Sequence, residues 1–166
     1  MAQPATIPEA AAVSGVHHVG VTVANLERAL EFWESFLGKP ARWTAVLESP
    51  YLSRVVGYPD ASIKAAFVDL PGGVVIELLD YHRVKDRLAN PEATANPGNV
   101  HLCLAAADLR AAWAHAVACG ARPVSPEGPV DIEAGPNQGA KAAYLRIHEN
   151  VTLELFQPAR REPSSS

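Results

Sequence analysis

The sequence is poor in the features that define several classes of protein. Its 166 residues include only two cysteines, and their spacing matches no metal site. We expect both to be small buried hydrophobic side chains, Cys103 in a strand and Cys119 at a helix end. No apolar run approaches the roughly 18 residues of a membrane span. The net charge is −4 without any basic run, which argues against nucleic acid as a partner. We therefore expect a cytoplasmic protein that contacts neither membrane nor nucleic acid.

What the sequence does contain is typical of one globular domain. Hydrophobic residues make up 48% of it and charged residues 19%, and a chain of this length buries roughly two-thirds of its unfolded surface. Residues 1–14 hold a short apolar stretch that no Lys or Arg precedes, which differs from a secretory signal. We expect flexible tails over residues 1–14 and 159–166.

The most informative pattern is an internal repeat in which each half carries a histidine near its start and a glutamate near its end. The first half runs from His18 to Glu77, and the second runs from His101 to Glu154. The histidines are 101 − 18 = 83 residues apart and the glutamates 154 − 77 = 77 apart, so the first half has 83 − 77 = 6 extra residues. Two such copies indicate a duplicated domain half. We divide the chain into a first module (15–81), a linker (82–98) and a second module (99–158).

Each module is predicted to follow the order βαβββ. In the first module, alternating β-branched residues predict a strand over 18–23, and Asn25 and Gly38 stand where a helix over 26–37 would begin and end. Further strands are predicted over 43–47, 63–70 and 74–79, with a long loop over 49–61. The second module repeats the order, with a strand over 100–105, a helix that follows Asp108 and ends at Cys119, a less regular strand region over 123–130, and strands over 141–147 and 151–156. The predicted fold class is α+β: two tandem βαβββ modules form a curved, mixed sheet that cups a metal site.

The four repeated residues share one position relative to the aliphatic side chains of their strands. Successive side chains of a strand point to opposite faces, and each of the four lies opposite a stripe of Val, Ile or Leu. His18, Glu77, His101 and Glu154 can therefore line the inside of one curved sheet whose outside is covered by helices. Two imidazoles and two carboxylates are a ligand set for a divalent metal such as Zn, Ni, Co, Mn or Fe.

This pattern resembles the vicinal oxygen chelate superfamily, which includes glyoxalase I, methylmalonyl-CoA epimerase, extradiol dioxygenases, and the fosfomycin and bleomycin resistance proteins. The resemblance covers about residues 16–158. It rests on His18 in His-His-Val-Gly-Val-Thr-Val, Glu77 in Ile-Glu-Leu-Leu, His101 in Val-His-Leu-Cys-Leu and Glu154 in Leu-Glu-Leu-Phe-Gln-Pro. Residues 139–145 and 153–158 are similar to the last hairpin of the epimerase branch. The resemblance implies that the four residues hold a metal, which binds two neighbouring oxygens of the substrate.

The ligand set and the resemblance favour a metal-dependent isomerase, epimerase or lyase that moves a proton next to a carbonyl. We expect Glu154 to carry the proton and Glu77 to act mainly as a ligand, with Glu48 or Asp60 as the alternative base. Two other functions are consistent with these residues. One is an Fe(II) dioxygenase of the extradiol type, which uses two histidines and one carboxylate. The other is a resistance protein that binds a small molecule without metal.

Residues that contact a small-molecule substrate are less clearly marked. The candidates for the wall of a pocket, or for recognition of an anionic group, are Tyr51, Arg54, Lys141 and Phe156. His17 has the opposite parity to His18 and is expected to pack or to meet solvent, and His148 is expected at the surface. We expect a homodimer. In the superfamily the site is built either within one chain or from halves that two chains exchange, and the sequence is consistent with both arrangements.

Overall fold

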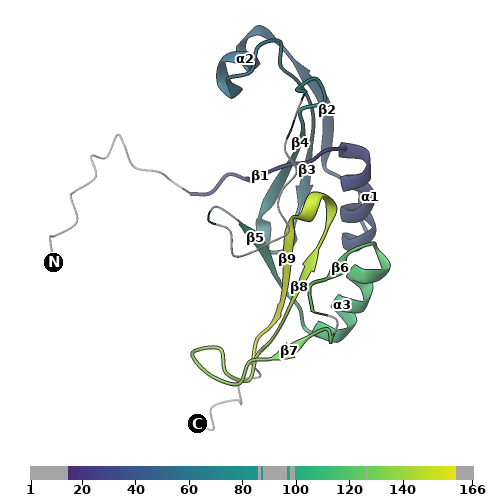
Figure 1. Ribbon diagram of the computed structural model, residues 1–166, viewed down its shortest axis with the longest axis vertical. Coiled ribbons are helices and arrows are strands. Elements are labelled where there is room, and N and C mark those ends of the chain that lie inside the picture. Colours follow the sequence, from purple (N-terminus) through teal and green to yellow (C-terminus); the bar gives the residue numbers. More distant parts are fainter. Residues whose placement is uncertain (1–14, 86, 88–96, 98–99, 126, 160–166) are drawn as a thin grey trace, which may run out of the picture.

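The computed structural model describes residues 15–85, 87, 97, 100–125 and 127–159. These residues form an elongated crescent in which two sheets follow one another, with the helices α1 and α3 on the convex side (Figure 1). The predicted tail over 1–14, most of the linker over 82–98 and all but one residue of the tail over 159–166 lie outside the described residues.

The first module forms a four-stranded mixed sheet in the order β1-β4-β3-β2. Its elements are β1 (Val19–Thr22), α1 (Leu26–Leu37), β2 (Trp43–Glu48), α2 (Pro50–Val56), β3 (Ser62–Asp69), the 3-10 turn η2 (Pro71–Gly73) and β4 (Val75–Asp80). The edge strand β1 runs parallel to β4, whereas β4, β3 and β2 are antiparallel neighbours. This arrangement places the first strand of the module beside its last.

The second module repeats this topology in the order β5-β9-β8-β6, with β7 also paired to β8. Its elements are β5 (His101–Ala105), α3 (Leu109–Ala118), β6 (Arg122–Pro123), β7 (Val130–Asp131), β8 (Lys141–Arg146), the 3-10 turn η3 (His148–Asn150) and β9 (Thr152–Gln157). The edge strand β5 is parallel to β9. The region predicted as one irregular strand over 123–130 contributes two strands of two residues each. The α+β class and the mixed strand pairing are confirmed, whereas the single curved sheet that was predicted is divided into two sheets, one for each module.

The helix α1 begins and ends where its capping residues predict. The Asn25 side chain accepts a hydrogen bond from the backbone N–H of Arg28 at 2.8 Å, which satisfies one free donor of the first turn. Gly38 is left-handed, with φ of +67°, and its N–H donates to the carbonyl of Glu34 at 2.9 Å. The predicted bounds 26–37 are confirmed, because residues next to the helix determine both of its ends.

The segment predicted as a loop over 49–61 contains the helix α2, so this part of the prediction is wrong. Pro50 occupies the first helical turn and Gly57 ends the helix in a left-handed conformation. Leu52 is buried in a small cluster with Ala61, Ile63 and Ala65. Contact with β3, which the local sequence does not reveal, stabilises the helix.

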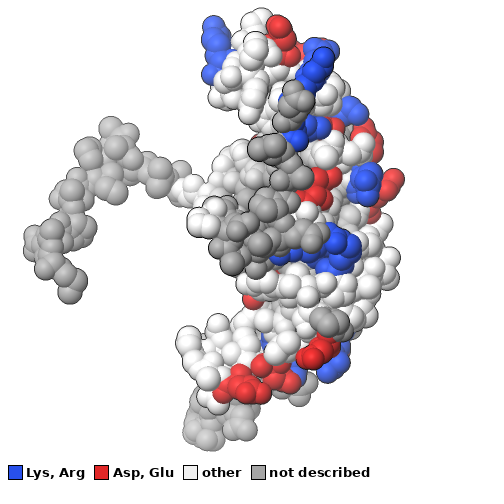
Figure 2. All heavy atoms as spheres, viewed as in Figure 1, with Lys and Arg blue, Asp and Glu red and all other residues white. Residues whose placement is uncertain are grey.

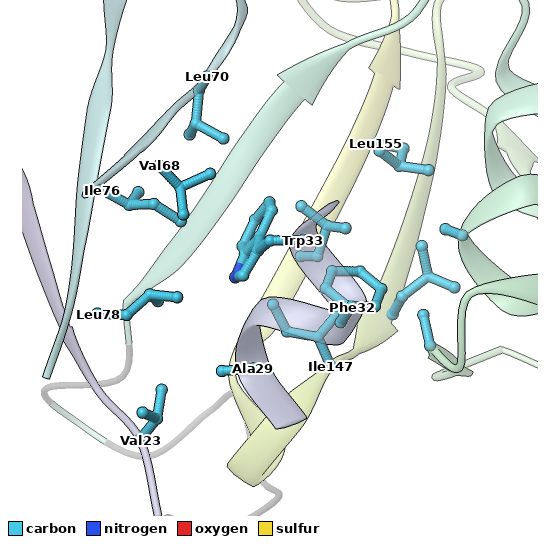
Figure 3. Close-up of a cluster of buried hydrophobic side chains, with 14 of the residues drawn as sticks. Val23, Ala29, Phe32, Trp33, Val68, Leu70, Ile76, Leu78, Ile147 and Leu155 are labelled. Carbon is cyan, nitrogen blue, oxygen red and sulfur yellow. The ribbon is translucent and has the colours of Figure 1, made fainter. Parts of the chain in front are cut away.

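The main hydrophobic core extends from one module into the other. It contains Trp33, which has no exposed surface, together with Leu78 of the first module and Leu155 of the second. Figure 3 shows Trp33 and Phe32 of α1 between side chains of the first sheet and side chains of the second module. The two modules therefore share one core, which fixes their relative orientation.

A polar contact between the modules lies within this core. The indole N–H of Trp33 donates to Nε2 of His148 at 2.9 Å, and Nδ1 of His148 lies 3.1 Å from a carboxylate oxygen of Glu149. The side chain of His148 is only 5% exposed, so the prediction that it lies at the surface is wrong. Glu149 and Asn150 both have positive φ, at +48° and +61°, a conformation that turns the chain sharply below the buried imidazole.

Charges of both signs are interspersed on the surface. Figure 2 shows Lys and Arg alternating with Asp and Glu along the convex side of the described residues. Among the described residues, no helix is long and apolar enough to cross a membrane.

Candidate metal centre

The first donor pair, His18 and Glu77, lies on the first sheet. Their side chains approach with Nε2 of His18 3.1 Å from Oε2 of Glu77. The pair forms because β1 is parallel to β4, with Gly20 directly opposite Glu77. The ring of Phe67, which is the neighbour of Glu77 on β3, lies 6.0 Å from the His18 ring. As predicted, Ile76 and Leu78 on either side of Glu77 are buried.

His17 contacts the imidazole of the first donor pair. Nδ1 of His17 lies 2.8 Å from Nδ1 of His18, and both residues are exposed. One ring must donate a proton to the other at this distance, so the contact orients His18 and leaves its Nε2 directed at Glu77. A partner on the second ring nitrogen is typical of metal-binding histidines. His17 does not share the face of His18, but its ring contacts the candidate ligand through the Nδ1 atom that faces away from Glu77.

The second donor pair, His101 and Glu154, has the same geometry in the second sheet. Nε2 of His101 lies 3.0 Å from Oε2 of Glu154. The neighbours of Glu154 on the two flanking strands are Cys103 on β5 and Tyr144 on β8. The Tyr144 ring lies 5.5 Å from the His101 ring at an interplanar angle of 39°. The two pairs thus match in their donors and differ in what flanks the glutamate.

The flanking thiol and phenol are held in their protonated forms. Partial desolvation of the thiol on the sheet face, followed by the charge of Glu154, raises the pKa of Cys103 to about 11. The same two causes, in the same order, raise the pKa of Tyr144. Cys103 is exposed, so the prediction that it is a buried hydrophobe is wrong. It lies on the face of His101 and away from the core.

The geometry of each pair is suited to a shared divalent ion. Two neighbouring ligands of an octahedral ion with metal–ligand distances of about 2.1 Å are about 3.0 Å apart, and the observed separations are 3.1 Å and 3.0 Å. Among the described residues, however, no three His, Cys, Asp or Glu side chains gather closely enough to hold a metal. One chain therefore presents two donor pairs, each of which is half of the predicted ligand set.

A groove of about 710 Å³ separates the edges of the two sheets. Its lining comes from residues 19–24, which include β1, and from Val84 and Arg87. Residues 100–102, around the start of β5, and residues 149–151, at the end of the η3 turn, complete it. His101 is part of this lining, as are Gly20 and Thr22, which share the face of His18. The groove thus extends from β1, the strand that follows His18, to His101.

The predicted substrate residues are dispersed. Tyr51 and Arg54 lie on α2, at one end of the crescent (Figure 1), and the Tyr51 side chain is exposed. Lys141, at the start of β8, forms an ion pair with Asp131. Phe156 follows Glu154 on the same face of β9, opposite Ala142. None of these four lines the groove between the sheet edges.

The alternative bases differ in how they are held. The Glu48 carboxylate accepts a hydrogen bond from Ser62 at 2.6 Å and pairs with Arg83 at 2.6 Å, and these two contacts lower the pKa of Glu48. A carboxylate held as an anion in this way is a poor proton acceptor. Asp60 has a positive φ of +51° in the turn before β3.

Sequence reasoning missed the aromatic neighbours of the two glutamates. Phe67 and Tyr144 are equivalent positions of the repeat, each directly opposite a candidate ligand glutamate. Their common offset of 144 − 67 = 77, equal to that of Glu77 and Glu154, was the available signal. If the last two strands of each module are paired antiparallel with these residues opposite the glutamates, Phe67 is placed beside Glu77 and Tyr144 beside Glu154.

Comparison with known proteins identifies the family. The chain belongs to the glyoxalase/bleomycin resistance protein/dioxygenase superfamily, whose model matches residues 17–144. This finding confirms the family predicted from the repeated His and Glu motifs. A 2-epi-5-epi-valiolone epimerase from an Actinomyces species is 31% identical over 155 residues, which cover 90% of this chain and 81% of the relative.

Solved structures share the fold. A glyoxalase family protein from Bacillus cereus superimposes with a TM-score of 0.74 at 19% identity, covering 90% of this chain and 97% of that one. A fosfomycin resistance protein from Listeria monocytogenes, crystallised with Mn(II) and sulfate, superimposes with a TM-score of 0.52 at 13% identity, covering 89% and 95% of the two chains. At these identities the comparison concerns the fold alone.

Proposed function

We propose that this protein is a divalent-metal-dependent epimerase or related isomerase that moves a proton next to a carbonyl of a small molecule. The observation that supports it most directly is the pair of His–Glu contacts at 3.1 Å and 3.0 Å in equivalent places of the repeat. The 31% identity to an epimerase favours isomerisation over the other chemistries of the superfamily. The substrate named for that relative is a ketone, and we take a small ketone as the substrate class here.

In this proposal His18, Glu77, His101 and Glu154 hold the ion. When bound, a divalent cation supplies Lewis acidity, which polarises a carbonyl and stabilises the negative charge that develops when the neighbouring proton leaves. Imidazole and carboxylate donors accept Zn, Ni, Co, Mn or Fe. The aromatic ring of Phe67 beside His18 gives this end of the site an apolar wall.

Removal of the proton is assigned to Glu154, whose carboxylate takes it from one face of the carbon, and epimerisation requires that a proton then return to the opposite face. Glu77 acts mainly as a ligand. Glu48 is the weaker candidate, because Ser62 and Arg83 already hold its carboxylate. A positioned carboxylate of this kind contributes roughly 100-fold or more to the rate.

We further propose that a second copy of the chain completes the site. The two donor pairs of one chain do not combine into a set of three among the described residues, and two donors alone form a weak site. Exchange of halves would bring the first donor pair of one copy to the second donor pair of the other. The open groove between β1 and β5 is where the partner would enter.

Mixed dimers test this arrangement. Neither His18→Ala nor His101→Ala protein alone should form a complete site. When the two variants are dissociated, mixed and reassembled, each mixed dimer regains one intact site, so about a quarter of all sites should bind metal again. Metal content that stays at the level of the separate variants would refute a shared site.

The reaction is tested with 2-epi-5-epi-valiolone in deuterated water. Metal-loaded protein should incorporate deuterium on the carbon beside the carbonyl, without uptake of O₂, and His101→Ala should abolish the exchange. Elemental analysis of the same preparations should give one divalent ion per four-ligand set. Wild-type protein that reloads no ion, or exchange that is equal in the His101→Ala variant, would contradict the proposal, and consumption of O₂ with cleavage of a catechol would replace it with a dioxygenase.

A further inference from the structure

A row of aromatic side chains extends from the first donor pair to the edge of the first sheet. The residues in register across the four strands are Trp43 on β2, Phe67 on β3, Glu77 on β4 and Gly20 on β1. The centres of the Trp43 and Phe67 rings are 5.2 Å apart, and the Phe67 ring lies 6.0 Å from that of His18. Both aromatic rings therefore share the face of the donor pair, opposite the core.

Phe67 is held in this row by its neighbours, whereas the indole of Trp43 is accessible. The guanidinium of Arg42 lies 5.4 Å from the centre of the Phe67 ring, and it is paired with Asp69 at 3.0 Å. Trp43 is 38% exposed. Two residues before Phe67, on the same face of β3, Ala65 is fully buried in the cluster that includes Leu52 of α2. The open part of this face is therefore bounded by α2 and contains the indole together with the first donor pair.

Among the described residues, the second sheet has no counterpart of this indole. Tyr144 takes the place of Phe67, and its ring lies beside that of His101. The neighbouring strand β6 ends at Pro123, and the next residue, Val124, donates its backbone N–H to the carbonyl of Tyr144 at 3.0 Å. Because the two donor pairs match, holding an ion does not explain an exposed indole beside only one of them. Its position indicates contact with the molecule that the ion binds.

We propose that Trp43 determines substrate specificity: its indole binds the C–H face of a cyclic ketone whose oxygens are held at the His18–Glu77 end of the site. This inference rests on the proposed function and narrows its substrate class from small ketones to cyclic ones. The faces of an aromatic ring carry negative potential, and the C–H bonds of an oxygenated ring carry partial positive charge. A ring covers the indole, whereas a three-carbon ketone held by the same oxygens covers much less of it.

Two hydroxyketones test this role with metal-loaded protein in deuterated water. The probes 2-hydroxycyclohexanone and hydroxyacetone present the same pair of neighbouring oxygens and differ in the ring. Trp43→Ala should raise KM for exchange of the cyclic ketone by about 10-fold. Its kcat should stay the same, because the indole contacts a part of the molecule that does not react. Both constants for hydroxyacetone should be unchanged, and Trp43→Phe, which keeps a ring, should retain most of the affinity for the cyclic ketone.

A control on the same strand separates this contact from a general effect on the sheet. Val46 lies opposite Lys64 on the helix-covered face of β2 and is 56% exposed. Val46→Ala should leave the constants for both ketones unchanged. Equal losses for the two ketones in Trp43→Ala, or no loss for either, would overturn the proposal.

If metal-loaded wild-type protein exchanges neither ketone, the proposed function fails, and NMR of the metal-free protein decides the inference. The same measurement replaces the kinetics if Trp43→Ala does not fold. The indole N–H signal of Trp43, identified by its loss in Trp43→Phe, should shift when cyclohexanol is added and stay in place with 2-propanol. No shift with cyclohexanol, or equal shifts with the two alcohols, would refute the binding of a ring by Trp43.

Discussion

Replacement of Trp33 by Phe tests whether the buried indole–imidazole contact joins the two modules. The contact spans 115 residues of sequence, from α1 to the η3 turn. Trp33 has no exposed surface, so its removal leaves Nε2 of His148 without its donor inside the core. An unsatisfied buried acceptor costs about 1–3 kcal/mol, and the smaller ring loses roughly 1 kcal/mol more in packing. The expected loss is therefore about 2–4 kcal/mol.

The loss is measured by chemical denaturation and by calorimetry. For a chain of this size, each kcal/mol lowers the melting temperature by about 2–4 °C, so Trp33→Phe should melt about 4–16 °C below wild type. Trp113→Phe is the control, because its indole N–H is buried without a hydrogen-bond partner among the described residues and only packing is lost.

A cycle with His148→Leu identifies the contact itself. Removal of both partners should cost clearly less than the sum of the two single losses, because neither group is then left unpaired. Additive losses, or a Trp33→Phe variant as stable as Trp113→Phe, would show that the hydrogen bond does not stabilise the pairing of the modules.

Three further changes probe the site. His17→Val, which copies the Val100 that precedes His101, should weaken metal binding by about 10-fold because His18 loses the partner of its Nδ1; unchanged affinity would mean that the contact has no role. In metal-free protein at pH 8, Cys103 should react with iodoacetamide about 10-fold more slowly than a thiol with a pKa of 9.0, because its pKa is raised to about 11 and the scarcer thiolate is only partly offset by its greater nucleophilicity; mass spectrometry of the labelled peptide gives the rate, and rapid labelling would contradict the raised pKa. Glu154→Gln should keep appreciable metal and lose roughly 100-fold or more of its turnover, whereas Glu48→Gln should remain active, and the opposite result would move the base to Glu48.

Local signals predicted the elements that are determined locally. Asn25 and Gly38 fixed the ends of α1 because each satisfies backbone groups of its own helix. Strand parity placed Glu77 and Glu154 opposite the core because one face of each sheet must be apolar. The donor pairs depend on the parallel pairing of the first and last strand of each module, which the sequence did not predict.

The errors arose where distant residues decide the outcome. His148 sits in a polar turn, and its burial depends on Trp33, which comes from the other module. The helix α2 is stabilised by Leu52 packing against Ile63, and its own sequence carries too little periodicity to predict it. Cys103 was misplaced because an apolar strand residue was assumed to face the core, although its parity is that of His101.

The edges of the two sheets have a consequence for how the chain folds. β1, with the sequence Val-Gly-Val-Thr, and β5, with His-Leu-Cys-Leu-Ala, each lie at the end of their sheet. Neither contains the Lys, Pro or Glu residues with which proteins discourage further strands from adding to an edge. Before the proposed dimer forms, both edges are open, and newly made chains can pair with one another in the wrong combination. Refolding yield should therefore fall as protein concentration rises, and a lysine introduced on β1 should relieve this loss while preventing formation of the proposed dimer.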